Sequence, residues 1–382
     1  MTPVATPPLP TPGPVRRRSP WRLALVPVAI LFALGLAEIA VRLFHLAPPV
    51  LQPRRYESPR GGVPFERLGG PDADPLFAYQ PNVTFSAIYD PRGDSHGNFG
   101  PDGRVTYEIN ARRMREVIQT RAKGPATQPD AAPYRIVCLG DSFTFGEGVR
   151  SGETYPDRLL YLLDGSIPGR EVEVFNAGVQ AYDTPREVWF YQQFARDLRP
   201  DVVIVAFCLN DACDTVDTIA QNDAMNRALT PSWLTEHSAL WSLFERRNHA
   251  ADLQASFFAQ IRRGFATERW DACRDAFAEL RALAKSDHFR VLVAIFPIFS
   301  QLDGDYPFTD LHAKIAAACR AADLPCLDLL PTYRGRPAES LWAHPTDQHP
   351  NALAHDLAAK AIAKALSPPP ASDPPPPTSP KR

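Results

Sequence analysis

Short apolar runs alternate with segments of helical periodicity over residues 134–366, and this alternation constrains the fold more than any other feature of the sequence. The runs are typical of strands buried on both faces of a sheet, and the segments between them carry apolar residues at threefold and fourfold spacing. Strands that alternate with helices form βαβ units, so the pattern predicts an α/β fold, a three-layer sandwich with a central parallel sheet. The expected strands are Arg135–Leu139, Val172–Phe175, Val202–Phe207, Val291–Phe296 and Cys326–Leu330, and the expected helices are Tyr155–Leu163, Arg186–Leu198, Trp270–Ala284, Asp310–Ala321 and Leu353–Leu366.

The rest of the chain differs in composition from this domain, which we place at residues 131–366. Many of the 41 prolines crowd the two ends, residues 1–22 and 367–382, where no apolar periodicity offsets the cost in chain entropy. We expect both ends to be disordered. Residues 47–130 are rich in Pro, Gly and Arg, with short strand-like pieces such as Val105–Ile109. We interpret them as a stalk or cap on the main domain.

An apolar stretch at residues 23–46 follows an arginine cluster at residues 16–22 and is long enough to cross a bilayer as a helix. Glu38 and Arg42 interrupt it at i,i+4 spacing, so the two side chains can pair on one helix face. We predict an uncleaved transmembrane signal anchor. A signal peptide cleaved near Gly35-Leu36-Ala37 is the main alternative, and a buried amphipathic core helix is another. Both leading interpretations export the bulk of the chain.

Charge and motif content argue against several classes of function. The formal net charge is −2 and no basic block is present, which argues against nucleic acid as a partner. His344 and His349 have no further ligands at metal-binding spacing, and the sequence contains no phosphate loop of the GxxxxGK type. We therefore expect no metal and no cofactor, and we set aside phosphatase and nuclease functions.

The cysteines and one aromatic segment leave structural alternatives open. Cys138 and Cys208 lie in apolar runs and are expected in the core. Cys319 and Cys326 flank a short turn, where they either form a local disulfide or stay free. The aromatic-rich segment Trp233–Phe244 either lines a lid or, as we favour, packs on the sheet.

Four short motifs place reactive or hydrogen-bonding side chains at the ends of expected strands or before the last helix. Gly140-Asp141-Ser142 follows the first strand, Asn176-Ala177-Gly178 ends the second, Asn210-Asp211 follows the third, and Asp347-Gln348-His349 lies on an expected loop. Ligands bind at the carboxyl ends of parallel strands. Singly, each motif has a local explanation, because Ser and Asp cap helices and Asn and Gly favour turns. Together they offer a serine, a base with an adjacent acid, and donors for an oxyanion.

As a set, these motifs resemble the blocks of the SGNH (GDSL-like) hydrolase family, over residues 134–366. The resemblance implies a flavodoxin-like SGNH hydrolase fold and a serine mechanism. The site residues that it implies are the nucleophile Ser142, the base His349, the acid Asp347, and an oxyanion hole formed by the N–H groups of Ser142 and Gly178 with the Asn210 side chain.

The sequence departs from the common family pattern in two places. Cys208 stands where the third block often has glycine, and the acid lies two residues before His349 rather than three. The shorter spacing also occurs in SGNH-like acetyltransferases that modify exopolysaccharides. The segment Tyr107–Arg113 and the N-terminal apolar stretch resemble a bacterial membrane-anchored subgroup, which implies a single-pass protein with its catalytic domain in the periplasm.

The function expected from these features is an exported serine esterase acting on acyl esters, with acetyl esters of envelope carbohydrate as the expected substrate. An acyl-enzyme can pass its acyl group to water or to a sugar hydroxyl, so an O-acyltransferase to polysaccharide is an alternative. A non-catalytic glycan-binding envelope protein is another, because fold does not fix function. The expected partners are the acyl-ester substrate, polysaccharide, and the membrane through residues 23–46.

Overall fold

The computed structural model describes residues 20–59, 61–69, 76–94, 96–117 and 132–366. The ends predicted to be disordered, residues 1–19 of the first and all of 367–382, lie outside the described residues. The chain forms two compact units. The first comprises Met1–Val50 and Ser232–Asn248, and the second comprises Leu51–Pro231 and His249–Arg382.

The second unit is built on a five-stranded parallel sheet, as the sequence predicted. Its strands are β6 (Tyr134–Gly140), β7 (Val172–Gly178), β8 (Val202–Cys208), β9 (Arg290–Phe296) and β10 (Cys326–Asp328), in the spatial order β10-β9-β8-β6-β7. This is the flavodoxin-like order. The chain passes from β6 to β7 on one side of it, then crosses back to β8 on the other side and continues outward through β9 and β10. Nearly every side chain of β8 is buried on both faces, which explains its continuous apolar run.

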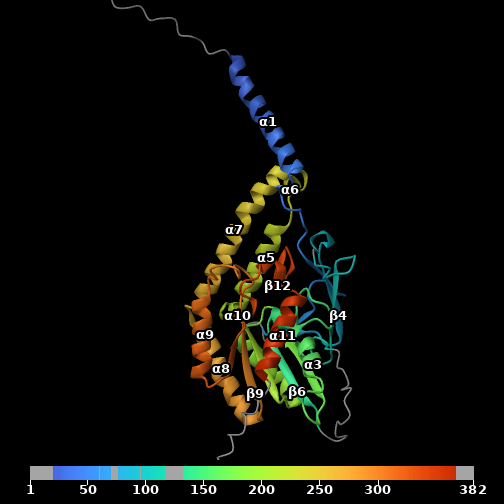
Figure 1. Ribbon diagram of the computed structural model, residues 1–382, viewed down its shortest axis with the longest axis vertical. Coiled ribbons are helices and arrows are strands. Elements are labelled where there is room, and N and C mark those ends of the chain that lie inside the picture. The colour runs from blue at the N-terminus through green and yellow to red at the C-terminus, as the bar shows by residue number, and fades with distance from the viewer. Residues whose placement is uncertain (1–19, 60, 70–75, 95, 118–131, 367–382) are drawn as a thin grey trace, which may run out of the picture. The chain divides into compact units, whose positions relative to one another are not determined.

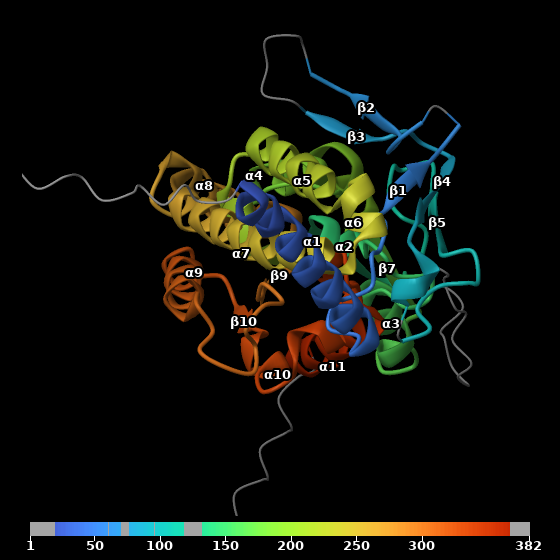
Figure 2. The same ribbon diagram turned by 90° about the horizontal axis from the view of Figure 1, so that it is seen from above.

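Helices cover both faces of this sheet (Figure 1). On one face α3 (Tyr155–Leu163) packs against α11 (Ala352–Leu366), and on the other α4 (Thr184–Phe190) packs against α8 (Glu268–Asp287), as Figure 2 shows. The next helix, α9 (Thr309–Ala321), packs against α8 and β10. The three-layer α/β prediction is therefore confirmed.

Some predicted bounds were wrong and some helices were not predicted. The helix expected at Arg186–Leu198 ends at Phe190, because the backbone then forms a π turn and a 3₁₀ turn. The helices α5 (Thr215–Leu229) and α7 (Ala239–Gly264) were not expected. Short helices also occur at α2 (Ser142–Phe145), α6 (Trp233–His237) and α10 (Leu330–Tyr333), and two short strands, β11 (Trp342–His344) and β12 (Asp347–Pro350), pair as an antiparallel hairpin.

The region before the parallel sheet forms small antiparallel sheets within the same compact unit. One consists of β1 (Arg55–Glu57), β4 (Val83–Ile88) and β5 (Arg104–Ile109), and the other pairs β2 (Phe65–Arg67) with β3 (Phe77–Tyr79). The first sheet buries Phe85 and Tyr107 against Phe145, which directly follows the strand β6 and its serine. Arg115 bridges Ile109 of β5 and Asn176 of β7. The region thus packs directly on the edge of the parallel sheet.

The first unit contains the apolar helix α1 (Pro20–Leu43), of which Leu25–Leu43 is long and apolar enough to cross a membrane. Its large apolar side chains from Leu25 to Leu36 are at least 50% exposed, so the alternative of a buried core helix is wrong. The segment Trp233–Phe244 belongs to this unit too. Its side chains Trp233 and Phe244 are exposed, so the expectation that the segment packs on the sheet is also wrong.

The cysteines follow the expectations only in part. Cys138 and Cys208 are buried in β6 and β8, which confirms their place in the core. Cys319 and Cys326 are both free thiols. A hydrogen bond between them raises the pKa of Cys319 and lowers that of Cys326. The two side chains are therefore neighbours without a disulfide.

Candidate active site

The parallel register brings three of the predicted motifs to one edge of the sheet. Gly140 at the end of β6 pairs with Gly178 of β7 on one side and with Ala206 of β8 on the other. The serine follows Gly140 by two residues, and Asn210 follows the end of β8 by two. Strand ends that share a register place the residues that follow them close together, as the sequence predicted.

Ser142 lies at the first position of α2, a single helical turn that begins where β6 ends. Asp141 caps this turn, because its Oδ1 accepts the backbone N–H of Phe143 at 2.8 Å. Gly146 ends the turn in the left-handed conformation, with φ of 82°, and donates its N–H to the carbonyl of Ser142. The capping role that sequence alone could assign to serine is thus filled by Asp141. The Ser142 hydroxyl is left half-buried at the sheet edge.

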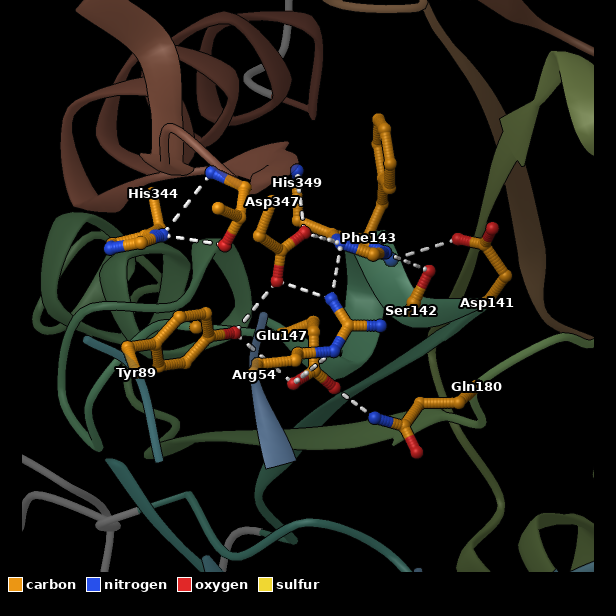
Figure 3. Close-up of polar contacts among 12 residues, drawn as sticks. Arg54, Tyr89, Asp141, Ser142, Phe143, Glu147, Gln180, His344, Asp347 and His349 are labelled. Carbon is orange, nitrogen blue, oxygen red and sulfur yellow. Dashed lines mark hydrogen bonds and ion pairs between the residues drawn. The ribbon is translucent and has the colours of Figure 1, made fainter. Parts of the chain in front are cut away.

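The predicted serine, histidine and acid are brought into contact from opposite ends of the domain. Nε2 of His349 lies 2.8 Å from Oγ of Ser142, and Nδ1 of His349 forms a short hydrogen bond with Oδ1 of Asp347 (Figure 3). With Nδ1 protonated toward the carboxylate, Nε2 is the atom that can accept the serine proton. The geometry is that of a nucleophile, a base and an orienting acid in series.

The acid and the histidine lie on strand β12 rather than on the expected loop. Successive side chains of a strand point to opposite faces, so Asp347 and His349 share one face. Gln348, between them, is exposed, whereas Asp347 is buried. The hairpin of β11 and β12 therefore explains why this acid stands two residues before its histidine.

Two residues from the N-terminal region hold the acid from behind, and sequence analysis missed both. Arg54 forms a short ion pair with Oδ2 of Asp347, and its Nη1 lies 3.3 Å from Nδ1 of His349. Tyr89 donates its hydroxyl to the same Oδ2 at 2.8 Å. Burial raises the pKa of Asp347, but the Arg54 guanidinium and His349 outweigh it and hold this pKa well below its usual range. Asp347 is thus kept ionised although it is buried.

Behind Arg54 the polar contacts continue into a buried network around Glu147. Tyr107 donates its hydroxyl to Oε1 of Glu147 at 3.1 Å, and Gln180 donates its amide to Oε2. The hydroxyl oxygen of Tyr89 lies 3.3 Å from the same Oε1. Nε of Arg54 lies 3.9 Å from Glu147. The guanidinium therefore lies between two buried carboxylates, and this fixes its position (Figure 3).

The residues predicted to form the oxyanion hole lie at the same edge of the sheet, and two of their donor groups already have hydrogen-bond partners. Nδ2 of Asn210 donates to Oδ2 of Asp141 at 2.9 Å, which orients the amide beside the serine. The N–H of Gly178 donates to Oδ1 of Asn176 at 3.1 Å, so this predicted donor is engaged in a local turn. A Cβ on residue 178 would lie 2.2 Å from the backbone nitrogen of Phe145, which explains why a glycine stands there.

Burial controls the chemistry of the groups beneath the serine. Burial raises the pKa of Asp141, although hydrogen bonds from Asn210 and Phe143 oppose the shift. Burial also raises the pKa of the Cys208 thiol well above its ordinary value, so Cys208 is a small core residue rather than a nucleophile. The departure from the family's glycine therefore adds no reactive group.

A second group of acids lies under the loop that carries Asn210. Glu187 and Asp211 are both buried, and Thr184 donates its hydroxyl to Oδ2 of Asp211 at 3.0 Å. Burial raises the pKa of each carboxyl well above its usual value. The charge of Asp141 adds to the shift at Glu187, and the charge of Glu187 adds to the shift at Asp211. Among the residues that the structure describes, no group of three or more His, Cys, Asp or Glu side chains is arranged to hold a metal ion.

Comparison with known proteins identifies the family of the chain. The model of the family described as GDSL-like Lipase/Acylhydrolase matches residues 138–357. A search of curated proteins finds no match to the chain. Similar solved structures include Axe2, an acetylxylan esterase from Geobacillus stearothermophilus, at 13% identity and a TM-score of 0.40, over 61% of this chain and 94% of that one.

Two further solved structures show similarly distant likeness. The acetyl xylan esterase AlAXEase is 14% identical, with a TM-score of 0.37 over 61% of this chain and 100% of that one. LAE5, an alpha/beta hydrolase enzyme from the metagenome of Lake Arreo in Spain, is 17% identical, with a TM-score of 0.38 over 62% and 95%. Likenesses at this level carry no argument about the substrate of this chain.

Proposed function

Because the chain belongs to the GDSL-like lipase/acylhydrolase family, we propose that it is an exported serine esterase that hydrolyses acyl esters, with acetyl esters of envelope carbohydrate as its substrate class. The observation that carries the proposal is the 2.8 Å contact between Oγ of Ser142 and Nε2 of His349, with Asp347 on the far side of the ring. A nucleophile in hydrogen-bond contact with an oriented base is the arrangement that acyl transfer through an acyl-enzyme requires.

The proposed reaction proceeds in two symmetric halves. Oγ of Ser142 attacks the ester carbonyl carbon while Nε2 of His349 takes the hydroxyl proton, and the ionised Asp347 stabilises the resulting imidazolium. The tetrahedral intermediate collapses, the C–O bond to the alcohol breaks, and the alcohol leaves with the proton from His349. Water then attacks the acyl-enzyme with the same proton transfers, which releases the acid and restores Ser142.

In this mechanism the oxyanion is stabilised by donors that are held in place before the substrate binds. The backbone N–H of Ser142 lies at the start of α2, and Asn210 carries a second amide N–H besides the one bonded to Asp141. The Gly178 N–H contributes as a third donor if the carbonyl oxygen of the substrate competes with Asn176 for it. The proposal therefore depends more on Asn210 than on Gly178.

We further propose that α1 is an uncleaved signal anchor, so that the esterase domain lies outside the cytoplasm. The support is the apolar span Leu25–Leu43, whose side chains as far as Leu36 are exposed. A cleaved signal peptide predicts a mature chain that begins near residue 38. The mass of the protein purified from membranes distinguishes the two.

The test is release of p-nitrophenol from its acetate and butyrate esters by the full chain in detergent, with Ser142→Ala and His349→Ala in parallel. We expect turnover by the wild type and loss in both variants. A folded wild type that hydrolyses neither ester would contradict an esterase. Adding a sugar acceptor identifies the alternative transferase, because acyl-sugar would then form at the expense of free acid.

A further inference from the structure

The uncharged part of α1 is shorter than the hydrocarbon core of a bilayer, so the candidate membrane span Leu25–Leu43 includes the charged residues Glu38 and Arg42. Arg22 and Glu38 bound the uncharged part of the helix and are sixteen residues apart in the sequence. Sixteen residues of α-helix rise about 24 Å. The hydrocarbon core of a bilayer is about 30 Å thick, so a helix that spans it carries at least one of these charges to the edge of the core.

Glu38 is the charged residue whose hydrogen bonds within the protein suit a position at the edge of the hydrocarbon core. Its Oε1 accepts the N–H of Ala239 at 2.8 Å, and its Oε2 accepts the Leu240 N–H and the Ser238 hydroxyl at 2.9 and 2.8 Å. These donors form the N-terminus of α7, whose helix dipole favours a negative charge. Arg42 adds an ion pair to Glu38 at 2.6 Å. Glu38 therefore holds the start of α7 beside the C-terminal half of α1.

The contacts of the neighbouring residues agree with this level. Val41 is buried, and Nη2 of Arg42 donates to the carbonyl of His237 at 2.7 Å. The contacts of α1 with the end of α6 and the start of α7 therefore begin only near Glu38. On the N-terminal side, Leu25 to Leu36 are exposed. The junction of α6 and α7 consequently lies beside the C-terminal part of α1, where apolar side chains such as Ile39 and Leu43 are still exposed.

Large apolar side chains are exposed at this junction. The side chains of Trp233 and Leu234 on α6 are 69% and 47% exposed, and those of Trp241 and Phe244 on α7 are 40% and 60% exposed. Tryptophan is enriched where a bilayer meets water, because its ring is largely apolar and its N–H is polar. We call these four residues the interfacial collar.

We propose that the interfacial collar inserts into the outer interface of the lipid bilayer, so that the chain contacts the membrane through α6 and α7 as well as through α1. The proposal rests on the proposed signal anchor. Insertion covers four large side chains that are otherwise exposed to water.

The test is quenching of tryptophan fluorescence by brominated phosphatidylcholine, with the full chain reconstituted in phosphatidylcholine vesicles. The bromines are placed near the headgroup. Trp233→Phe/Trp241→Phe removes two of the six tryptophans, and the substitutions keep both positions apolar. Trp189→Phe, in the second unit, is the matched control. Trp21 precedes the apolar stretch and is unchanged in every variant.

We expect the quenched share of emission to fall to about half or less in Trp233→Phe/Trp241→Phe. We expect no such fall in Trp189→Phe. Extraction with alkaline carbonate is measured in parallel. A chain that resists extraction, with equal quenching in the wild type and the double variant, overturns the collar and leaves the anchor. A chain that carbonate extracts overturns both. Neither outcome depends on esterase activity, so failure of the proposed reaction is detected separately.

Discussion

The candidate site is assembled from two stretches of the second unit, and only one of them matches the family model. Residues 138–357, which match the family model, supply every group that the mechanism brings to the substrate. Residues 51–117 lie outside the match and supply Arg54 and Tyr89. Arg54 contacts the acid and the histidine, and Tyr89 contacts the acid. The comparison suggests that the family motifs specify the chemistry, while the N-terminal region specifies the electrostatic state of the acid.

Two buried carboxyl sites show what the N-terminal region contributes. Asp347, which Arg54 contacts, has a pKa held well below its usual range. Glu187 and Asp211 lie wholly within the matched stretch, and burial raises both of their pKa values well above the usual range. All three carboxyls are buried. Positive charge lowers the pKa of Asp347 only, first from the Arg54 guanidinium and then from His349, so the proposed mechanism depends on Arg54 to help keep its acid ionised.

The largest predicted effect tests whether the matched stretch carries the chemistry. We expect Ser142→Ala and His349→Ala each to reduce kcat by about 10⁴-fold or more, because each removes a group that takes part in bond making. The double variant should be hardly worse than either single variant, since the two groups act as one unit. Ester hydrolysis by purified variants measures this. Retention of activity in either variant would remove the serine mechanism.

The next effect concerns Asn210, the proposed oxyanion donor that follows the third strand. Asn210→Ala should reduce kcat by about 10²–10³-fold and leave KM nearly unchanged, because the donor acts mainly on the transition state. Asn176→Ala provides the comparison within the same edge, since it releases the Gly178 N–H from its local bond. An Asn210→Ala enzyme with wild-type turnover would show that this amide is not a donor to the oxyanion.

A smaller effect is predicted for Arg54 in the N-terminal region. It tests whether this region, rather than the matched stretch, sets the electrostatic state of the acid. Arg54→Ala should reduce kcat by about 10–100-fold, the usual scale for a partner that supports a site residue from behind. Arg54→Lys should recover part of the loss, because it restores the positive charge beside Asp347. Arg55→Ala is the matched control, since the Arg55 side chain is 67% exposed.

The same variants carry a pH readout. Removing the guanidinium withdraws a charge that lowers the pKa of Asp347, so this pKa should rise and the acidic limb of the kcat/KM profile should move to higher pH in Arg54→Ala. It should return toward the wild-type position in Arg54→Lys. If Arg54→Ala matched Arg55→Ala in rate and in pH profile, the N-terminal region would be only a structural support.

The smallest effect concerns the acids that lack a guanidinium. Because the pKa of Glu187 is raised in the folded state, its contribution to stability is fully present below the unfolded pKa, about 4.3, and is lost as the pH rises toward the folded value. Between pH 5 and pH 8, Glu187→Gln should therefore lose less stability than the wild type, by about 1 kcal/mol or more.

Chemical unfolding at the two pH values measures this difference, and Glu279→Gln, an exposed acid on α8, is the control. An equal loss of stability in the wild type and in Glu187→Gln would mean that this carboxyl ionises freely inside the protein. The pKa of Glu187 would then not be raised, and the contrast between this carboxyl and Asp347 would be lost.

Sequence patterns predicted the parts of the site that are local in the chain or repeat along it. The strands of the parallel sheet are buried on both faces, so their apolar runs were visible, and Ser142 and His349 were found because each follows or precedes such an element. The hairpin strand β12 is only four residues long and was expected to be a loop. Its pairing with β11 nevertheless accounts for the spacing of Asp347 and His349.

Arg54 could not be predicted, because its partner lies 293 residues away and its own segment has no periodicity. A lone arginine in a Pro-rich region looks the same whether it is exposed, as Arg55 is, or buried against an acid. The helix α7 was missed for a related reason. Its early aromatic side chains Trp241 and Phe244 are exposed, so the segment lacks the one-sided pattern of a helix packed on a sheet.

The central claim is that Ser142, at the carboxyl edge of the parallel sheet, is the nucleophile. Labelling with a fluorophosphonate followed by peptide mass mapping tests it most directly. The full chain should gain one adduct, on the peptide that contains Ser142. The adduct should be absent from Ser142→Ala, and it should form much more slowly in His349→Ala. An adduct on another serine, or ester hydrolysis that persists in Ser142→Ala, would contradict the account.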